Sequence, residues 1–214
     1  MFNNTETEQQ VAEFLLQIKA IKLQPNNPFT WASGWKSPIY CDNRITLSHP
    51  TIRTYIRQQL SQVIQERFGA VGCIAGVATA GIPQGVLIAQ ELGLPFIYVR
   101  SKPKEHGTGS MIEGDNILTG KRVVVIEDLI STGKSSLQAV NALREAEYDV
   151  AGLAAIFTYG FDIATENFKK AKCPFITLSN YTALLKYAEE QQYISANDVE
   201  MLKQWRKDPS TWGQ

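Results

Sequence analysis

The sequence has few cysteines and no long apolar run, and each scarcity excludes a class of protein. Cysteine occurs three times in 214 residues, at Cys41, Cys73 and Cys173, an odd and scattered set without metal-ligand spacing. A disulfide framework is therefore excluded, and we expect a reducing, cytoplasmic compartment. No segment approaches the roughly 20 apolar residues that span a bilayer. The N-terminus also lacks the basic start and apolar core of a signal peptide.

The chain also lacks net charge. Lysine plus arginine and aspartate plus glutamate number 21 each, so the formal net charge is zero. No overall field attracts the protein to nucleic acid or to an anionic membrane, and we expect neither as a partner. A chain of this length can bury one sizeable core, with at most a small appendage.

Strand-like and helical patterns alternate through the middle of the chain. Strands are predicted near residues 71–77, 95–99, 122–126, 150–157 and 175–178. A helix that ends at Gly69 precedes them, and helices near 82–92, 134–145 and 163–171 fall between them. This succession predicts an α/β fold, a parallel sheet flanked by helices.

The two chain ends have a different pattern. Thr7-x-x-Gln10 resembles a capping box before a helix, and short extended segments at 21–23, 29–32 and 37–42 surround a Ser33-Gly34 turn. Helices are predicted near 182–190 and 195–205. We expect a single domain in which about 1–45 and the C-terminal helices form a cap, or hood, over an α/β core of about 46–180.

The most informative stretch covers residues 123–136. Four apolar residues lead into Glu127 and Asp128, and a turn of small residues then opens a helical segment. Carboxylates at the carboxyl end of a buried strand lie where open α/β sheets bind ligands. The turn from Ser131 to Ser136 offers backbone N–H groups at a helix N-terminus, which favour phosphate. Together these features predict a pocket for a phosphorylated sugar.

Three other interpretations of these motifs are weaker. Gly133-Lys134-Ser135 resembles the end of a nucleotide-binding P-loop, but Asp128 stands where that motif needs a glycine. Gly107-x-Gly109 resembles the start of a dinucleotide fingerprint, but Ile112 occupies the third glycine position. An ordinary helix start capped by serine or threonine is the third alternative, although it leaves the adjacent carboxylates unexplained.

Residues 101–119 show no usable periodicity and form a longer connection than compact α/β units normally use. Arg100 begins an alternation with Lys102, Lys104 and His106 that can direct several cations at one polyanion. A disordered surface excursion is the alternative. Cations here and carboxylates at the neighbouring strand end suit displacement at an anomeric carbon, where positive charge develops on the sugar as an anion departs.

Residues 123–135 resemble the phosphoribosyl pyrophosphate signature of the type I phosphoribosyltransferases. Three more segments resemble the branch of that family that acts on orotate: Phe29–Tyr40, Gly76–Pro83 and Arg100–Gly107. The resemblance implies transfer of ribose 5-phosphate from phosphoribosyl pyrophosphate to orotate in pyrimidine biosynthesis. It also implies Mg²⁺ as cofactor, held mainly by substrate and water, and a homodimer whose loop is shared across the interface.

The resemblance also implies roles for individual residues. Asp128, Lys104 and His106 are expected to act in catalysis, and Ser131, Tyr40 and Cys41 to bind orotate. The residues expected to bind phosphoribosyl pyrophosphate are Arg100, Lys102, Lys104, His106, Glu127, Asp128, Leu129, Ile130, Ser131, Thr132, Gly133, Lys134 and Ser135.

The chain departs from the enterobacterial pattern of that branch at three places. Ala32 replaces a lysine, Thr79-Ala80 replaces tyrosine-lysine, and Thr158-Tyr159-Gly160 stands where an orotate-binding arginine is expected. Lys102, Arg44 or Lys36 are candidates to restore the lost positive charge. A purine or uracil phosphoribosyltransferase, or a non-catalytic ligand-sensing regulator on the same fold, remain the alternatives.

Overall fold

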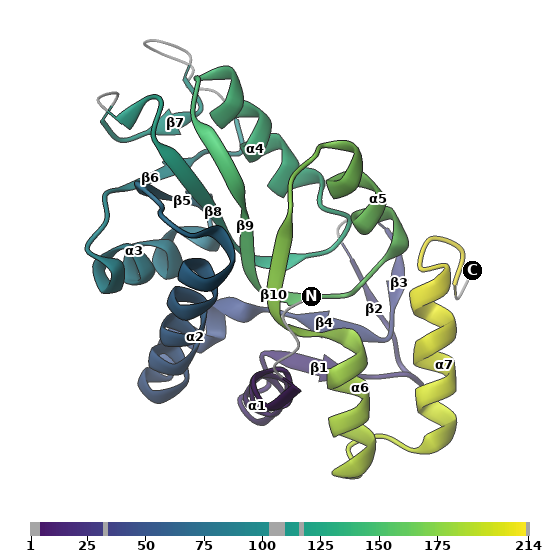
Figure 1. The fold of residues 1–214 in the computed structure, drawn as a ribbon. Helices are drawn as coiled ribbons and strands as arrows, with labels where there is room; N and C mark the ends of the chain where they lie inside the picture. The colour runs from purple at the N-terminus through teal and green to yellow at the C-terminus, as the bar shows by residue number, and fades with distance from the viewer. Residues whose placement is uncertain (1–4, 32–33, 103–109, 116–117, 213–214) are drawn as a thin grey trace.

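A six-stranded sheet forms the centre of the molecule (Figure 1). The computed structural model describes residues 5–31, 34–102, 110–115 and 118–212. Five strands run parallel, and the short edge strand β7 is antiparallel to β6. The sheet order is β10 (Phe175–Asn180), β9 (Asp149–Thr158), β8 (Arg122–Ile130), β5 (Cys73–Val77), β6 (Phe96–Val99) and β7 (Ile112–Glu113).

Helices cover both faces of this sheet. Helices α2 (Pro50–Phe68) and α3 (Gly81–Leu92) lie on one face, and α4 (Lys134–Glu145) and α5 (Asp162–Lys170) lie on the other. Successive residues of β8 point to opposite faces, so Val124 and Ile126 pack in the first core while Val123 and Val125 pack in the second. Burial on both faces explains the unbroken apolar run in the sequence.

Segments from the two ends of the chain pack together beside the sheet. Trp205 of α7 is fully buried, and its indole N–H donates a hydrogen bond to the Lys36 carbonyl at 3.2 Å. Trp31, Tyr159 and Tyr181 surround its ring. The elements of this layer are α1 (Thr5–Gln17), β1 (Ile21–Leu23), β2 (Phe29–Thr30), β3 (Lys36–Ser37), β4 (Ile39–Cys41), α6 (Tyr181–Glu190) and α7 (Ala196–Lys207).

The predicted alternation of strands and helices is confirmed. The short extended segments predicted near the N-terminus form two antiparallel pairs, β1 with β4 and β2 with β3. The predicted capping box at Thr7 is wrong. Thr7 is buried inside α1, and its hydroxyl donates to Gln59 Oε1 at 3.0 Å. A contact with α2, 52 residues away, therefore determines the role of this side chain.

Two elements near the predicted site also differ from the prediction. Strand β8 continues to Ile130, so Glu127 and Asp128 lie within the strand and not at its end, because β9 extends to Thr158 and pairs with Ile130. Residues 112–113 form β7, and residues 43–48 form the 3-10 helix η1 (Asn43–Ser48). In the part of the chain that the structure describes, no helix has the length and apolar character needed to cross a bilayer.

Candidate active site

The two adjacent carboxyl groups of β8 are held in place by hydrogen bonds. Glu127 is 5% exposed, and its carboxylate accepts from the Ser136 hydroxyl at 3.2 Å and from the Asp128 backbone N–H at 3.1 Å. The Asn43 side-chain amide donates to the Asp128 carbonyl at 2.7 Å, which ties this point of β8 to η1. Ser136 lies in the first turn of α4, so the acidic pair and the helix start are one connected unit.

Burial changes the ionisation of this pair. It raises the pKa of Glu127 well above the usual carboxyl range, and the neighbouring charge of Asp128 raises it further. Burial also raises the pKa of Asp128, while its hydrogen bond with Glu127 opposes that shift. Because Glu127 is the more deeply buried, we infer that it takes up a proton first, and Asp128 carries the negative charge.

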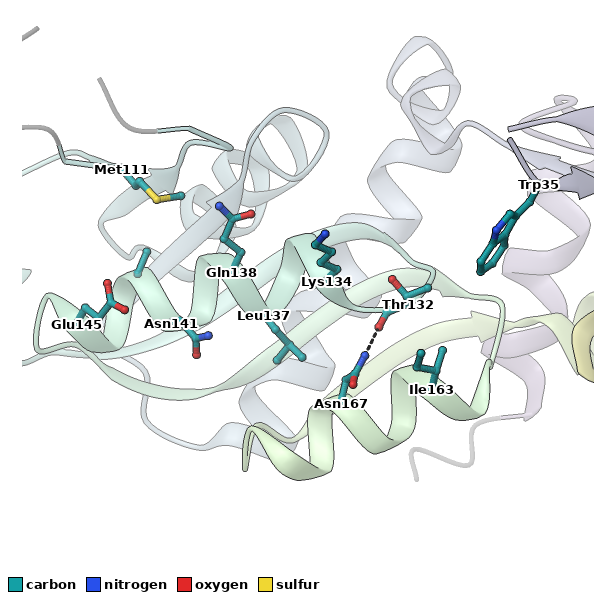
Figure 2. Close-up of a pocket in the computed structure, with 11 residues that line it drawn as sticks. Trp35, Met111, Thr132, Lys134, Leu137, Gln138, Asn141, Glu145, Ile163 and Asn167 are labelled. Carbon is teal, nitrogen blue, oxygen red and sulfur yellow. Dashed lines mark hydrogen bonds between the residues drawn. The ribbon is translucent and has the colours of Figure 1, made fainter. Parts of the chain in front are cut away.

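The turn between β8 and α4 is built around a glycine. Gly133 is the N-cap residue with φ +78°, a left-handed conformation, and an added Cβ would lie 2.7 Å from Phe168. The Asn167 amide donates to the Thr132 carbonyl at 3.1 Å, which fastens the turn to α5 (Figure 2). No side chain of the described residues caps α4. The alternative of a serine- or threonine-capped helix is therefore wrong, and the N–H groups of the first turn are available to an anion.

The start of α3 approaches the same strand. An added Cβ at Gly81 would collide with the Ile126 carbonyl, so only glycine allows this contact between α3 and β8. The segment from Gly76 to Pro83 thereby lies directly beside the residue that precedes the acidic pair. Ala78 and Thr79 in this segment are joined by a cis peptide bond.

A cavity of about 280 Å³ opens between the N-terminal strands β2 and β4 and the carboxyl ends of β8 and β9. Ser131, Tyr40 and Cys41, the residues expected to bind a base, all line it. The remaining lining residues are Thr30, Trp31, Leu129 and Tyr159. Trp31 and Tyr159 were not predicted as cavity residues, although Trp31 lies in one of the segments that carry the resemblance.

A larger hollow of about 850 Å³ lies along the outer side of α4 (Figure 2). Thr132 and Lys134 of the turn contribute to its wall, together with Leu137 of α4 and Ile163 of α5. The turn between β8 and α4, where a phosphate is expected, is therefore open to solvent along α4.

The expected pyrophosphate-binding cations lie partly within the described residues. Arg100 follows β6, and its guanidinium is 3.2 Å from the Glu113 carboxylate of β7. Lys102 is exposed, and the preceding Ser101 carbonyl accepts from Gln138 at 3.5 Å, so the chain passes close to the N-terminal half of α4 here. Lys104 and His106 lie outside the described residues.

The candidates for the missing positive charge have different surroundings. Lys36 donates to the Thr30 hydroxyl at 2.9 Å, which brings a cation to a side chain of the cavity wall. The Arg44 guanidinium is held by Asp42 at 2.7 Å, and this pairing lowers the pKa of Asp42. Ala32, which replaces the expected lysine, lies outside the described residues.

Comparisons with known proteins agree with this geometry. The family model described as Phosphoribosyl transferase domain matches residues 46–188. Orotate phosphoribosyltransferase of Phocaeicola vulgatus is 58% identical over 96% of this chain and 96% of its own length. The enzyme of the same name from Porphyromonas gingivalis is 56% identical over 95% and 96%. The crystal structure of orotate phosphoribosyltransferase from Aeropyrum pernix superposes with a TM-score of 0.71 at 25% identity, covering 86% of this chain and 99% of that one.

Proposed function

The chain belongs to the phosphoribosyl transferase family, and we propose that it transfers ribose 5-phosphate from phosphoribosyl pyrophosphate to orotate. The products are orotidine 5′-phosphate and pyrophosphate, and the enzyme is a pentosyl-transferring glycosyltransferase of pyrimidine biosynthesis. Relatives that carry the orotate phosphoribosyltransferase name match nearly the whole chain. Neither a purine or uracil enzyme nor a non-catalytic regulator is favoured by these relatives.

One structural observation carries this function: the acidic pair, the phosphate turn and the base-sized cavity share consecutive residues. Glu127 and Asp128 bind the ribose hydroxyls, and the segment from Leu129 to Ser135 receives the 5′-phosphate. Ser131 belongs to both the turn and the cavity wall. A base in the cavity and a phosphate on the turn would therefore both lie within a few residues of the acidic pair, as one nucleotide requires.

Asp128 stabilises the transition state. As the bond from C1 to the pyrophosphate oxygen breaks, the leaving group takes the electron pair and positive charge develops on the ribose. The ring nitrogen of orotate forms the new bond to C1 and gives up its proton, and the departing pyrophosphate takes up a proton. A negative carboxylate beside the ribose lowers the energy of the charged sugar, provided that Asp128 is the ionised member of the pair.

Cations stabilise the departing pyrophosphate. Arg100, Lys102, Lys104 and His106 fulfil this role, with Lys104 and His106 supplied by the segment beyond Lys102. Such a loop also excludes water, which would otherwise hydrolyse the reactive sugar. Arg100 would exchange its contact with Glu113 for the pyrophosphate when substrate binds.

Mg²⁺ fits this site through the substrate. The described residues contain no cluster of three or more metal-ligating side chains, whereas Mg²⁺ binds readily through one or two carboxylates together with phosphate oxygens and water. When bound, the ion neutralises charge on the pyrophosphate. Asp128, the ionised member of the pair, is the carboxylate that would be available to it.

We further propose a cytoplasmic homodimer in which the loop of one subunit acts at the site of its partner. In this proposal about 1–45 and the C-terminal helices are the hood, which would carry the base side of the cavity. The remainder, about 46–180, is the core that carries the phosphate turn.

A pyrophosphate-release assay tests the proposed function. The enzyme is incubated with phosphoribosyl pyrophosphate, Mg²⁺ and one base at a time from orotate, uracil, adenine, guanine and hypoxanthine. Release with orotate alone supports the proposal. Release with another base and not with orotate would contradict it, and no release with any base would contradict catalysis.

A further inference from the structure

Tyr159 is held rigidly at the end of β9. Its side chain is 2% exposed. Four aromatic rings surround it, with centroids 5.2 Å away for Trp31, 5.4 Å for Phe161, 5.8 Å for Trp205 and 5.9 Å for Phe157. A ring packed on so many sides has essentially one orientation. The direction of its hydroxyl is therefore fixed as well.

The Tyr159 hydroxyl has no hydrogen-bond acceptor among the described residues. Tyr181 provides the contrast, because its equally buried hydroxyl donates to the Leu202 carbonyl at 3.1 Å. Tyr159 lines the 280 Å³ cavity, and its hydroxyl is not among the fully enclosed unpaired atoms, so it opens into that cavity. A phenol hydroxyl in an otherwise apolar setting normally has a partner, which indicates that a ligand supplies one.

The rest of the cavity wall is uncharged. None of its seven residues carries a charged side chain. Two of its polar groups are already engaged, since the Thr30 hydroxyl accepts from Lys36 and the Cys41 thiol donates to Asn43. Burial raises the pKa of Tyr159 well above its ordinary value, so the hydroxyl remains a donor at all physiological pH values. The available donors therefore suit a planar ligand with acceptor oxygens.

We propose that Tyr159 determines base recognition by donating a hydrogen bond to an oxygen of orotate, with Trp31 and Leu129 forming apolar walls of the base site. This inference rests on the proposed function. It assigns a neutral donor to the position where the resemblance leads one to expect an arginine. Recognition of the base would then depend on direction and shape more than on charge.

The test compares Tyr159→Phe with Tyr181→Phe as a matched control. Tyr159→Phe keeps the ring and its packing, so we expect KM for orotate to rise about tenfold or more, since one hydrogen bond to a charged ligand is lost. KM for phosphoribosyl pyrophosphate and Tm should remain near the wild-type values. Tyr181→Phe should lower Tm, because the buried hydrogen bond to the Leu202 carbonyl is lost, and should leave KM for orotate unchanged.

The competing outcomes separate this inference from the proposed function. An active wild-type enzyme whose Tyr159→Phe variant keeps the same KM for orotate would overturn the inference alone. Equal increases in both KM values would also overturn it, because they indicate a structural role. A wild-type enzyme that does not use orotate would instead overturn the proposed function.

Two further measurements follow: inhibition of the variant identifies the acceptor, and a crystal of the wild-type protein tests the inference without the variant. If Tyr159→Phe weakens both inhibition by uracil and the use of orotate, the acceptor is a ring carbonyl that the two bases share. If it weakens only the use of orotate, the acceptor is the orotate carboxylate. Either result supports the inference. A crystal of the wild-type protein with orotidine 5′-phosphate should place the Tyr159 hydroxyl within hydrogen-bond distance, up to about 3.0 Å, of a base oxygen. A hydroxyl without a base oxygen in reach would contradict it.

Discussion

Adjacent carboxyl groups in a buried strand are costly unless they serve a ligand. Glu127 reduces this cost through Ser136 and a backbone N–H, and through uptake of a proton. Asp128 retains the charge, beside the site where we propose that positive charge develops on the ribose. We therefore propose different functions for the two residues, although they are neighbours and both acidic.

Replacement of Asp128 by asparagine tests the catalytic role. The change keeps the shape of the side chain and removes its charge, which matters most in the transition state. We expect kcat to fall about 100-fold, with little change in KM for phosphoribosyl pyrophosphate. Steady-state kinetics with both substrates provide the measurement. An unchanged kcat would show that Asp128 does not contribute to catalysis.

Replacement of Glu127 by glutamine should stabilise the protein at neutral and alkaline pH. The pKa of Glu127 is raised in the folded state, so the folded protein binds more protons than the unfolded chain above about pH 4.5, and stability is lost as pH rises through the folded-state pKa. Glutamine avoids this loss. Each kcal/mol relieved raises Tm by about 2–4 °C for a chain of this size.

Thermal unfolding from pH 4 to pH 9 measures this effect. The difference in Tm between Glu127→Gln and wild type should be positive at pH 8 and should shrink toward pH 4.5. Glu166→Gln is the control, because Glu166 is exposed and pairs only with Lys170, so its effect should be small at every pH. A Glu127→Gln variant that is less stable at pH 8 would contradict the proposed ionisation.

At the scale of single residues, the sequence could identify those candidate site residues that lie in one continuous stretch. Glu127, Asp128 and the glycine of the turn follow one another, so their proximity needs no tertiary information. Tyr159 could not be predicted as a cavity residue in the same way. Its environment depends on Trp31 and Trp205, which come from distant parts of the chain.

The β8–turn–α4 element depends on the conformation of Gly133. Substitution by alanine imposes a left-handed backbone on a residue with a Cβ and also brings that Cβ to 2.7 Å from Phe168. We expect a loss of about 1–3 kcal/mol in the free energy of unfolding. KM for phosphoribosyl pyrophosphate should rise several-fold, because the N–H groups of the first turn of α4 are displaced.

Gly93→Ala is the matched control for this substitution. Gly93 ends α3 with φ +64°, and no atom lies within 4 Å of the position of an added Cβ. The Gly93→Ala variant therefore has the same kind of backbone strain without the clash. Gly93 also lies at the end of α3 that is distant from the acidic pair. We expect a smaller loss of stability and no change in KM. Similar KM values for Gly133→Ala and wild type would argue against phosphate binding by this turn.

Element boundaries were predicted well where a hydrophobic period was present and poorly where pairing decided them. Helix α4 begins and ends at the predicted residues. Strand β8 runs past Ile126 because β9 provides hydrogen-bonding partners as far as Thr158. A two-residue strand such as β7 has no detectable period, so only its pairing with β6 identifies it.

At the scale of the whole molecule, the α/β class followed from the alternation of strands and helices. A cap built from the two chain ends was also expected, but the individual contacts that join those ends could not be predicted. The hydrogen bond from Trp205 to Lys36 spans 169 residues. Such contacts place Thr30, Trp31 and Tyr40 of the N-terminal segments in one cavity wall with Leu129 and Ser131 of the core. The proposed dimer extends the same principle, because each site would combine residues of two subunits.

Mixed dimers test whether the loop acts across the interface. Lys104→Ala and Asp128→Asn subunits are each expected to be poorly active alone, with Lys104 lying outside the described residues and Asp128 on β8. If each site combines Lys104 of one subunit with Asp128 of the other, a mixed dimer contains one intact site and one doubly defective site. Random mixing of equal amounts by refolding should then restore about one quarter of wild-type activity.

The recovery depends on which subunit supplies the loop, and this makes the experiment decisive. If Lys104 acts at the site of its own subunit, no mixed dimer contains an intact site, and activity stays at the mean of the two parents. Two variants on the same side of the site, Asp128→Asn and Gly133→Ala, serve as the control. Both defects lie in the core of one subunit, so a mixed dimer leaves each site with one defect in either arrangement, and no recovery is expected. Recovery with the first pair and not with the second would therefore require a loop that crosses between subunits.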